Sequence, residues 1–172
     1  MKIDSSFIAD FIFAALIYIL LLFTLWKEKG TKKILLNTVF YFYIVAVLTV
    51  TVMPVIENIK YIGTFPYRYM RLIPFDDYNC GRAAAFKQIV LNTLMFVPLG
   101  FLLPLIGKHK FLFVTLVSFG FSTFIEVFQP FISSVRYSDI TDVITNTLGG
   151  MMGYLIYFII RKLMDKRRRT KN

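Results

Sequence analysis

Five apolar runs, each about twenty residues long, constrain this chain more than any other feature. They cover roughly Phe7–Trp26, Ile34–Met53, Gln88–Ile106, Phe111–Gln129 and Ile140–Ile160. A helix of about twenty residues crosses the hydrocarbon core of a bilayer, and only helices or closed barrels satisfy their backbone hydrogen bonds there. Because 57% of the 172 residues are hydrophobic, the runs predict an all-α membrane protein. We expect one domain over residues 1–172, a polytopic bundle of five transmembrane helices.

The basic residues predict the orientation of this bundle. Lysines lie between the first two runs at Lys27–Lys33 and between the third and fourth at Lys108–Lys110, and the tail from Arg161 to Lys171 is strongly basic. Since Lys and Arg beside a span stay in the cytoplasm, we expect the N-terminus outside and the C-terminus cytoplasmic. The basic tail is then explained by topology and by attraction to anionic headgroups, so we expect no nucleic-acid partner.

Residues 54–87 form the longest connection, which this topology places outside. Aromatic residues alternate there with arginines from Phe65 to Phe75. This pattern is typical of an aromatic belt at the headgroup interface. If the segment instead folds over the membrane end of the protein, Arg68 or Arg71 is placed to bind a lipid phosphate or pyrophosphate. Cys80 is the one cysteine of the chain, and we expect it to be a free thiol.

Polar side chains recur in the third, fourth and fifth runs at steps of three and four residues, which is the spacing of one helix face. With the expected topology, all of them lie in the outer half of the membrane. They are Gln88, Asn92, Glu126, Gln129, Arg136, Asp139, Asp142 and Asn146. A polar or charged group at bilayer depth is costly unless it faces a partner or water. We therefore expect these residues to converge on one extracytoplasmic pocket.

The uncharged members of this set also have a packing interpretation. Asn92 and Asn146 are as consistent with interhelical hydrogen bonds as with ligand binding. Gly149 and Gly153, in the fifth run, are spaced for close helix packing, and we expect them to press this helix against a neighbour.

The carboxylates favour a function more strongly. Glu126, Asp139 and Asp142 repel one another unless Arg136, a raised carboxylate pKa, a divalent cation with oxygen ligands or a cationic group of a ligand intervenes. The sequence contains no Cys/His metal spacing, Gly-rich phosphate loop or G-x-S-x-G motif. No cofactor is therefore predicted, and a divalent cation stays open.

Four motifs in fixed order then suggest a family. They are RLIPF at 71–75, NTLMFVPLGFLLP at 92–104, EVFQ at 126–129, and the pattern R-x-x-D-x-x-D-x-x-x-N-T-x-G at 136–149. With these motifs the chain resembles the VanZ-like family of bacterial membrane proteins. The resemblance implies a cell-membrane protein of a Gram-positive envelope, where the family's namesake confers low-level resistance to teicoplanin-type glycopeptides. It implies family residues at Asn92, Glu126, Gln129, Arg136, Asp139, Asp142 and Asn146.

Three functions fit these residues. We favour binding of a membrane lipid, a lipoglycopeptide or a lipid-linked cell-wall precursor, with ligand contacts from Asn92, Gln129, Arg136, Asn146 and Arg71. In an enzyme acting on a lipid-linked headgroup, Glu126 would be the general acid or base, while Asp139 and Asp142 position a cation or the partner proton. A transporter is less favoured because the inner halves of the spans lack matching polar groups. The ligand and the oligomeric state stay open.

Overall fold

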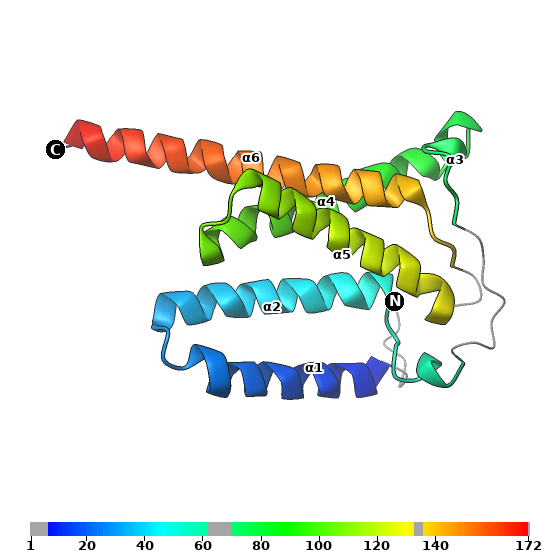
Figure 1. The fold of residues 1–172 in the computed structure, drawn as a ribbon, viewed down its shortest axis with the longest axis horizontal. Coiled ribbons are helices and arrows are strands. Elements are labelled where there is room, and N and C mark those ends of the chain that lie inside the picture. The colour runs from blue at the N-terminus through cyan, green and yellow to red at the C-terminus, as the bar shows by residue number, and fades with distance from the viewer. Residues whose placement is uncertain (1–6, 62–69, 133–135, 172) are drawn as a thin grey trace. The chain divides into compact units, whose positions relative to one another are not determined.

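The computed structural model describes residues 7–61, 70–132 and 136–171. The described chain is helical, with one isolated bridge between Arg71 and Asp139. Figure 1 shows the elements in order: α1 (Ile8–Leu21), the π-helical turn η2 (Leu22–Trp26), α2 (Thr31–Thr51), the 3₁₀ turn η3 (Asn58–Tyr61), α3 (Asp76–Asn79), α4 (Ala85–Gly107), α5 (Phe111–Ile132) and α6 (Ile140–Lys171). Arg68 lies outside the described residues.

Five helical stretches of the described residues are long and apolar enough to cross a membrane. The predicted all-α architecture is thus confirmed, with five candidate spans as expected. They are Ile8–Trp26, Thr31–Thr51, Ala85–Gly107, Phe111–Ile132 and Ile140–Thr170. α4 continues through Pro98 and Pro104. α6 extends beyond the predicted end at Ile160, because the Lys and Arg residues that follow are good helix formers.

The chain forms two compact units. The first unit consists of Met1–Arg71 and Phe124–Asp139, and the second of Leu72–Thr123 and Ile140–Asn172. The long helix α5 thus contributes its last residues to the first unit and its earlier residues to the second.

In the first unit, α1 and α2 lie side by side (Figure 1) and are joined by side-chain hydrogen bonds. The hydroxyls of Tyr18 and Thr38 share one bond of 3.1 Å, and the hydroxyl of Tyr41 donates to the carbonyl of Ala14. At the opposite end of α1, Asp10 is only 3% exposed. Its carboxylate accepts the backbone N–H groups of residues 55 and 56 at 2.6 and 2.9 Å. This buried charge therefore fixes the chain that leaves α2.

In the second unit, α4 and α6 pack through glycines. A Cβ atom added at Gly149 would lie 2.0 Å from the carbonyl oxygen of Thr93, and one at Gly153 would lie 2.0 Å from that of Val97. Gly100 faces the backbone of α6 in the same way. Only glycine permits this approach of two backbones. The packing role predicted for Gly149 and Gly153 is confirmed.

Candidate functional site

The polar residues of the first unit gather where α5 ends, and Glu126 is at their centre. Its side chain is only 2% exposed. One carboxylate oxygen accepts the backbone N–H of Asp139 at 2.9 Å, and the main-chain carbonyl of Glu126 accepts the hydroxyl of Ser138. Ser138 and Asp139 are also buried. Glu126 therefore fixes the short segment before α6 through both its side chain and its backbone.

Arg71 joins this segment from the long connection. Its N–H donates to the carbonyl of Ser138 at 2.9 Å, beside the isolated parallel bridge between Arg71 and Asp139. The guanidinium carbon of Arg71 lies 3.8 Å from the centroid of the Tyr137 ring. A guanidinium stacked on a ring is held in one plane and donates hydrogen bonds in that plane. Arg71 is thus a cation with a fixed position.

Two further residues of the predicted site contact the last turn of α2. The amide nitrogen of Gln129 donates to the carbonyl of Thr51 at 2.9 Å, and a terminal nitrogen of Arg136 lies 3.5 Å from the carbonyl of Val50. The last four carbonyls of a helix lack partners within the helix and attract donors and cations. Burial lowers the pKa of Arg136, and the negative charge of Glu126 opposes that shift. Arg136 therefore places its charge between a helix end and a carboxylate.

The second unit holds the other predicted residues. The amide nitrogen of Gln88 on α4 donates to the Asp142 carboxylate on α6 at 3.3 Å. One helical turn further along α6, Asn146 donates to the hydroxyl of Ser122 on α5 at 2.8 Å. Asn146 is 2% exposed, and its Oδ1 is buried with no hydrogen-bond partner among the residues described. Asn92 is half-buried on α4.

The predicted site residues therefore occupy two groups, one in each unit. The first unit contains Arg71, Glu126, Gln129, Arg136 and Asp139, and the second contains Asn92, Asp142 and Asn146. Their convergence on one pocket stays a prediction. Within residues 7–61, 70–132 and 136–171, no three His, Cys, Asp or Glu side chains form a group that could hold a metal ion.

Sequence reasoning overlooked several residues that make contacts within the first unit. Tyr137 and Ser138 are unspecified positions of the R-x-x-D pattern, yet one stacks on Arg71 and the other bonds to Glu126. Asp10 gave only a weak signal as an acidic residue near the start of an apolar run. A carboxylate in that position needs a partner, although the sequence does not identify the backbone N–H groups that supply it.

Comparison with known proteins places these two groups in a family. The family model described as VanZ/LLP1 matches residues 40–161, a range that contains every site residue named above. The chain is also 31% identical to Protein VanZ from Enterococcus faecium over 141 residues, which cover 79% of this chain and 81% of that protein. No solved structure matches the chain. With its five long apolar helices and a family match over most of its length, this chain belongs to the VanZ/LLP1 family of membrane proteins.

Proposed function

We propose that this protein binds an amphiphile at the extracytoplasmic end of its first unit and so lowers the sensitivity of the cell to teicoplanin-type glycopeptides. The observation that carries the proposal is the fixed cation at Arg71, stacked 3.8 Å from the Tyr137 ring centroid. A side chain that is already ordered loses little conformational entropy on binding. A fixed guanidinium next to an aromatic ring suits the anionic group of a lipid, a lipid-linked precursor or a lipoglycopeptide.

An orientation with the N-terminus outside supports this proposal. An odd number of spans puts the two termini on opposite faces of the membrane, and the strongly basic tail favours the cytoplasm. The C-terminal ends of α2 and α5 are then extracytoplasmic, together with Arg71. The relative from Enterococcus faecium supports a location in the cell membrane of a Gram-positive bacterium.

The first unit brings two arginines to the segment before α6. Glu126 has the backbone N–H of Asp139 as a partner, and Arg136 adds a positive charge next to Glu126. Arg71 brings a second guanidinium to this segment. Glu126 and Asp139 bring two carboxylates to the same segment, so the proposal depends on the fixed planar geometry of the Arg71 guanidinium and not on an excess of positive charge.

The test is a resistance profile in a susceptible host without the protein. Cells expressing the wild-type chain or Arg71→Gln are compared by their minimum inhibitory concentrations for glycopeptides that differ only in the acyl tail. We expect the wild type to protect against the acylated drugs, and Arg71→Gln to return protection to the level of cells without the protein.

Arg82→Gln is the matched control, because Arg82 lies in the same connection, has an exposed side chain and pairs with the half-buried Asp77 at 2.8 Å. An exposed ion pair contributes little to stability, so this variant should protect like the wild type. Membrane abundance of each variant is measured by immunoblot. Equal protection against a drug without an acyl tail would contradict the binding of amphiphiles.

A further inference from the structure

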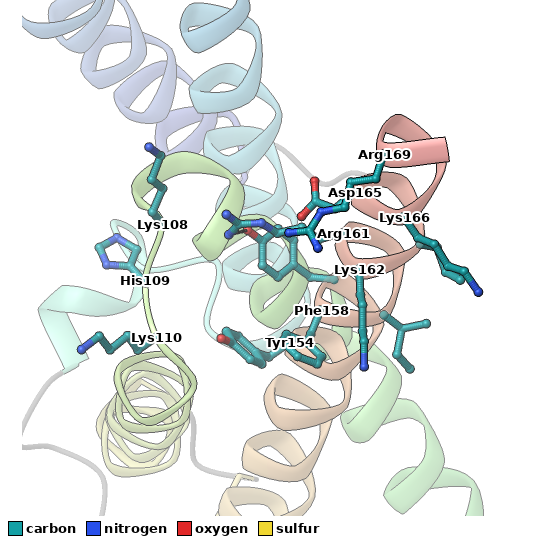
Figure 2. Close-up of a pocket in the computed structure, with 13 residues that line it drawn as sticks. Lys108, His109, Lys110, Tyr154, Phe158, Arg161, Lys162, Asp165, Lys166 and Arg169 are labelled. Atoms are coloured by element: carbon teal, nitrogen blue, oxygen red, sulfur yellow. Dashed lines mark hydrogen bonds between the residues drawn. The ribbon is translucent and has the colours of Figure 1, made fainter. Parts of the chain in front are cut away.

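A second charged site lies in the second unit, at the end away from Gln88 and Asp142, and uses none of the predicted site residues. A pocket of about 960 Å³ opens between the α4–α5 turn and the later part of α6. Its lining includes one carboxylate, that of Asp165, and six cationic side chains, those of Lys108, Lys110, Arg161, Lys162, Lys166 and Arg169. Figure 2 shows Arg161 and Arg169 coming from α6, with Lys108 and Lys110 on the turn. The net positive charge favours an anionic ligand.

Aromatic packing gives this pocket a defined wall. Tyr157 is 9% exposed, and its hydroxyl accepts a hydrogen bond from Arg161 at 3.0 Å. Its ring lies 5.9 Å from that of Tyr154, which in turn packs edge-on against Phe111 at 5.4 Å. One guanidinium of the pocket is thus held by a buried tyrosine. This contact distinguishes Arg161 from a freely moving surface arginine.

The remaining wall of the pocket is apolar and exposed. Phe158, Ile159 and Leu163 line it with exposed fractions of 51%, 56% and 57%. α6 has 32 residues, which corresponds to about 48 Å against a hydrocarbon core of about 30 Å. The helix therefore passes from the hydrocarbon core into the headgroup layer, and this pocket combines apolar side chains with cations. That combination matches an acyl chain joined to a phosphate.

We propose that this pocket binds a phosphate-bearing anionic membrane lipid, with Arg161 and Arg169 on the phosphate and the acyl chain along Phe158 and Ile159. With six cations and one carboxylate in the lining, a headgroup with two phosphates is bound more tightly than a headgroup with one. In the proposed orientation the lipid belongs to the cytoplasmic leaflet. Binding itself depends neither on that orientation nor on the proposed function.

The experiment measures lipid binding to the purified full chain in detergent by native mass spectrometry. The probes are cardiolipin with two phosphates, phosphatidylglycerol with one, and zwitterionic phosphatidylcholine. We expect affinity to fall in that order. The double variant Arg161→Gln/Arg169→Gln should bind cardiolipin about tenfold more weakly or worse, since each cation near a phosphate contributes substantially to affinity.

The control variant is Arg167→Gln/Arg168→Gln, which removes the same charge from the same helix at positions that do not line the pocket. It should keep the affinity of the wild type. Equal losses in the two double variants would overturn the proposal, because they would show diffuse attraction to headgroups. Equal affinity for inorganic pyrophosphate and cardiolipin would overturn the assignment to a lipid.

Size-exclusion elution shows whether each variant keeps its fold. If the Arg161→Gln/Arg169→Gln variant elutes as aggregate, Tyr157→Phe replaces it, because it keeps the ring and removes only the hydroxyl bonded to Arg161. We expect a weaker affinity for cardiolipin in Tyr157→Phe, and an unchanged affinity would overturn the proposal.

Discussion

Glu126 shows how a single carboxylate is accommodated inside an apolar helix. The run around it would place a charge at a costly depth, but the N–H of Asp139 lies 2.9 Å from the carboxylate. A hydrogen bond from a backbone N–H stabilises the ionised form. Glu126, for which the sequence suggests a role as general acid or base, therefore also holds the backbone of the segment before α6.

We therefore expect two substitutions at Glu126 to differ in stability. Glu126→Ala removes the acceptor of a buried N–H and should lower the free energy of unfolding by about 1–3 kcal/mol. Glu126→Gln keeps a side-chain carbonyl as acceptor and should lower the free energy of unfolding by a smaller amount. Thermal unfolding of the purified protein in detergent measures both. Equal stability of Glu126→Ala and the wild type would mean that the contact with Asp139 contributes nothing.

Asn146 illustrates what a sequence leaves undecided at a single position. Its spacing from Asp142 predicts a shared helix face, and both residues are on α6 in the second unit. The bond to Ser122 supports the packing interpretation for the side-chain nitrogen, while the buried Oδ1 without a described partner leaves room for a ligand contact. The hydrogen-bond partner of such a side chain depends on the rotation of each helix about its own axis. No pattern in a single sequence gives that rotation.

Among the elements, the contact between α4 and α6 depends most directly on residue identity. Gly149 faces the backbone of Thr93, and Gly153 that of Val97, one turn further along both helices. Without hydrophobic driving force between helices in lipid, association relies on close van der Waals packing. The glycine spacing predicted this contact correctly. Glycine is a poor helix former, so two glycines four residues apart in an apolar helix indicate close packing against another helix.

Gly149→Ala tests that contact. The new Cβ would lie 2.0 Å from the carbonyl oxygen of Thr93, so the helices must separate, and we expect a loss of about 1–3 kcal/mol in unfolding free energy. Gly120→Ala is the control, because its Cβ would meet nothing within 4 Å on α5 and alanine favours a helix. Unfolding in detergent compares the two. A Gly149→Ala variant as stable as Gly120→Ala would mean that the helices separate at no cost.

The helices were more predictable than their connections. Long apolar runs locate all five spans, because backbone hydrogen bonding in lipid permits few alternatives. The π-helical turn Leu22–Trp26, the bridge from Arg71 to Asp139 and the stacking on Tyr137 carry no comparable signal. The bridge and the stacking join segments that are distant in sequence. The candidate site was accordingly predicted as a set of residues, while their partners came from the structure.

For the molecule as a whole, the orientation in the membrane decides which surface meets an external drug. Arg71 and Cys80 share the connection between α2 and α4, and Lys108 lies in the turn between α4 and α5. A single candidate span, α4, separates that turn from Cys80, so a crossing of the membrane by α4 puts the two positions on opposite faces. The proposed topology places Cys80 outside and Lys108 in the cytoplasm.

Cys80 provides a direct test because it is exposed and is the only cysteine of the chain. A membrane-impermeant maleimide should label the wild-type protein in intact cells. The variant Cys80→Ser/Lys108→Cys, whose new thiol sits at an exposed position, should be labelled only after the membrane is permeabilised. Each label is measured by mass spectrometry of the purified chain. The reverse pattern would place Arg71 in the cytoplasm and remove the basis for its contact with an external amphiphile.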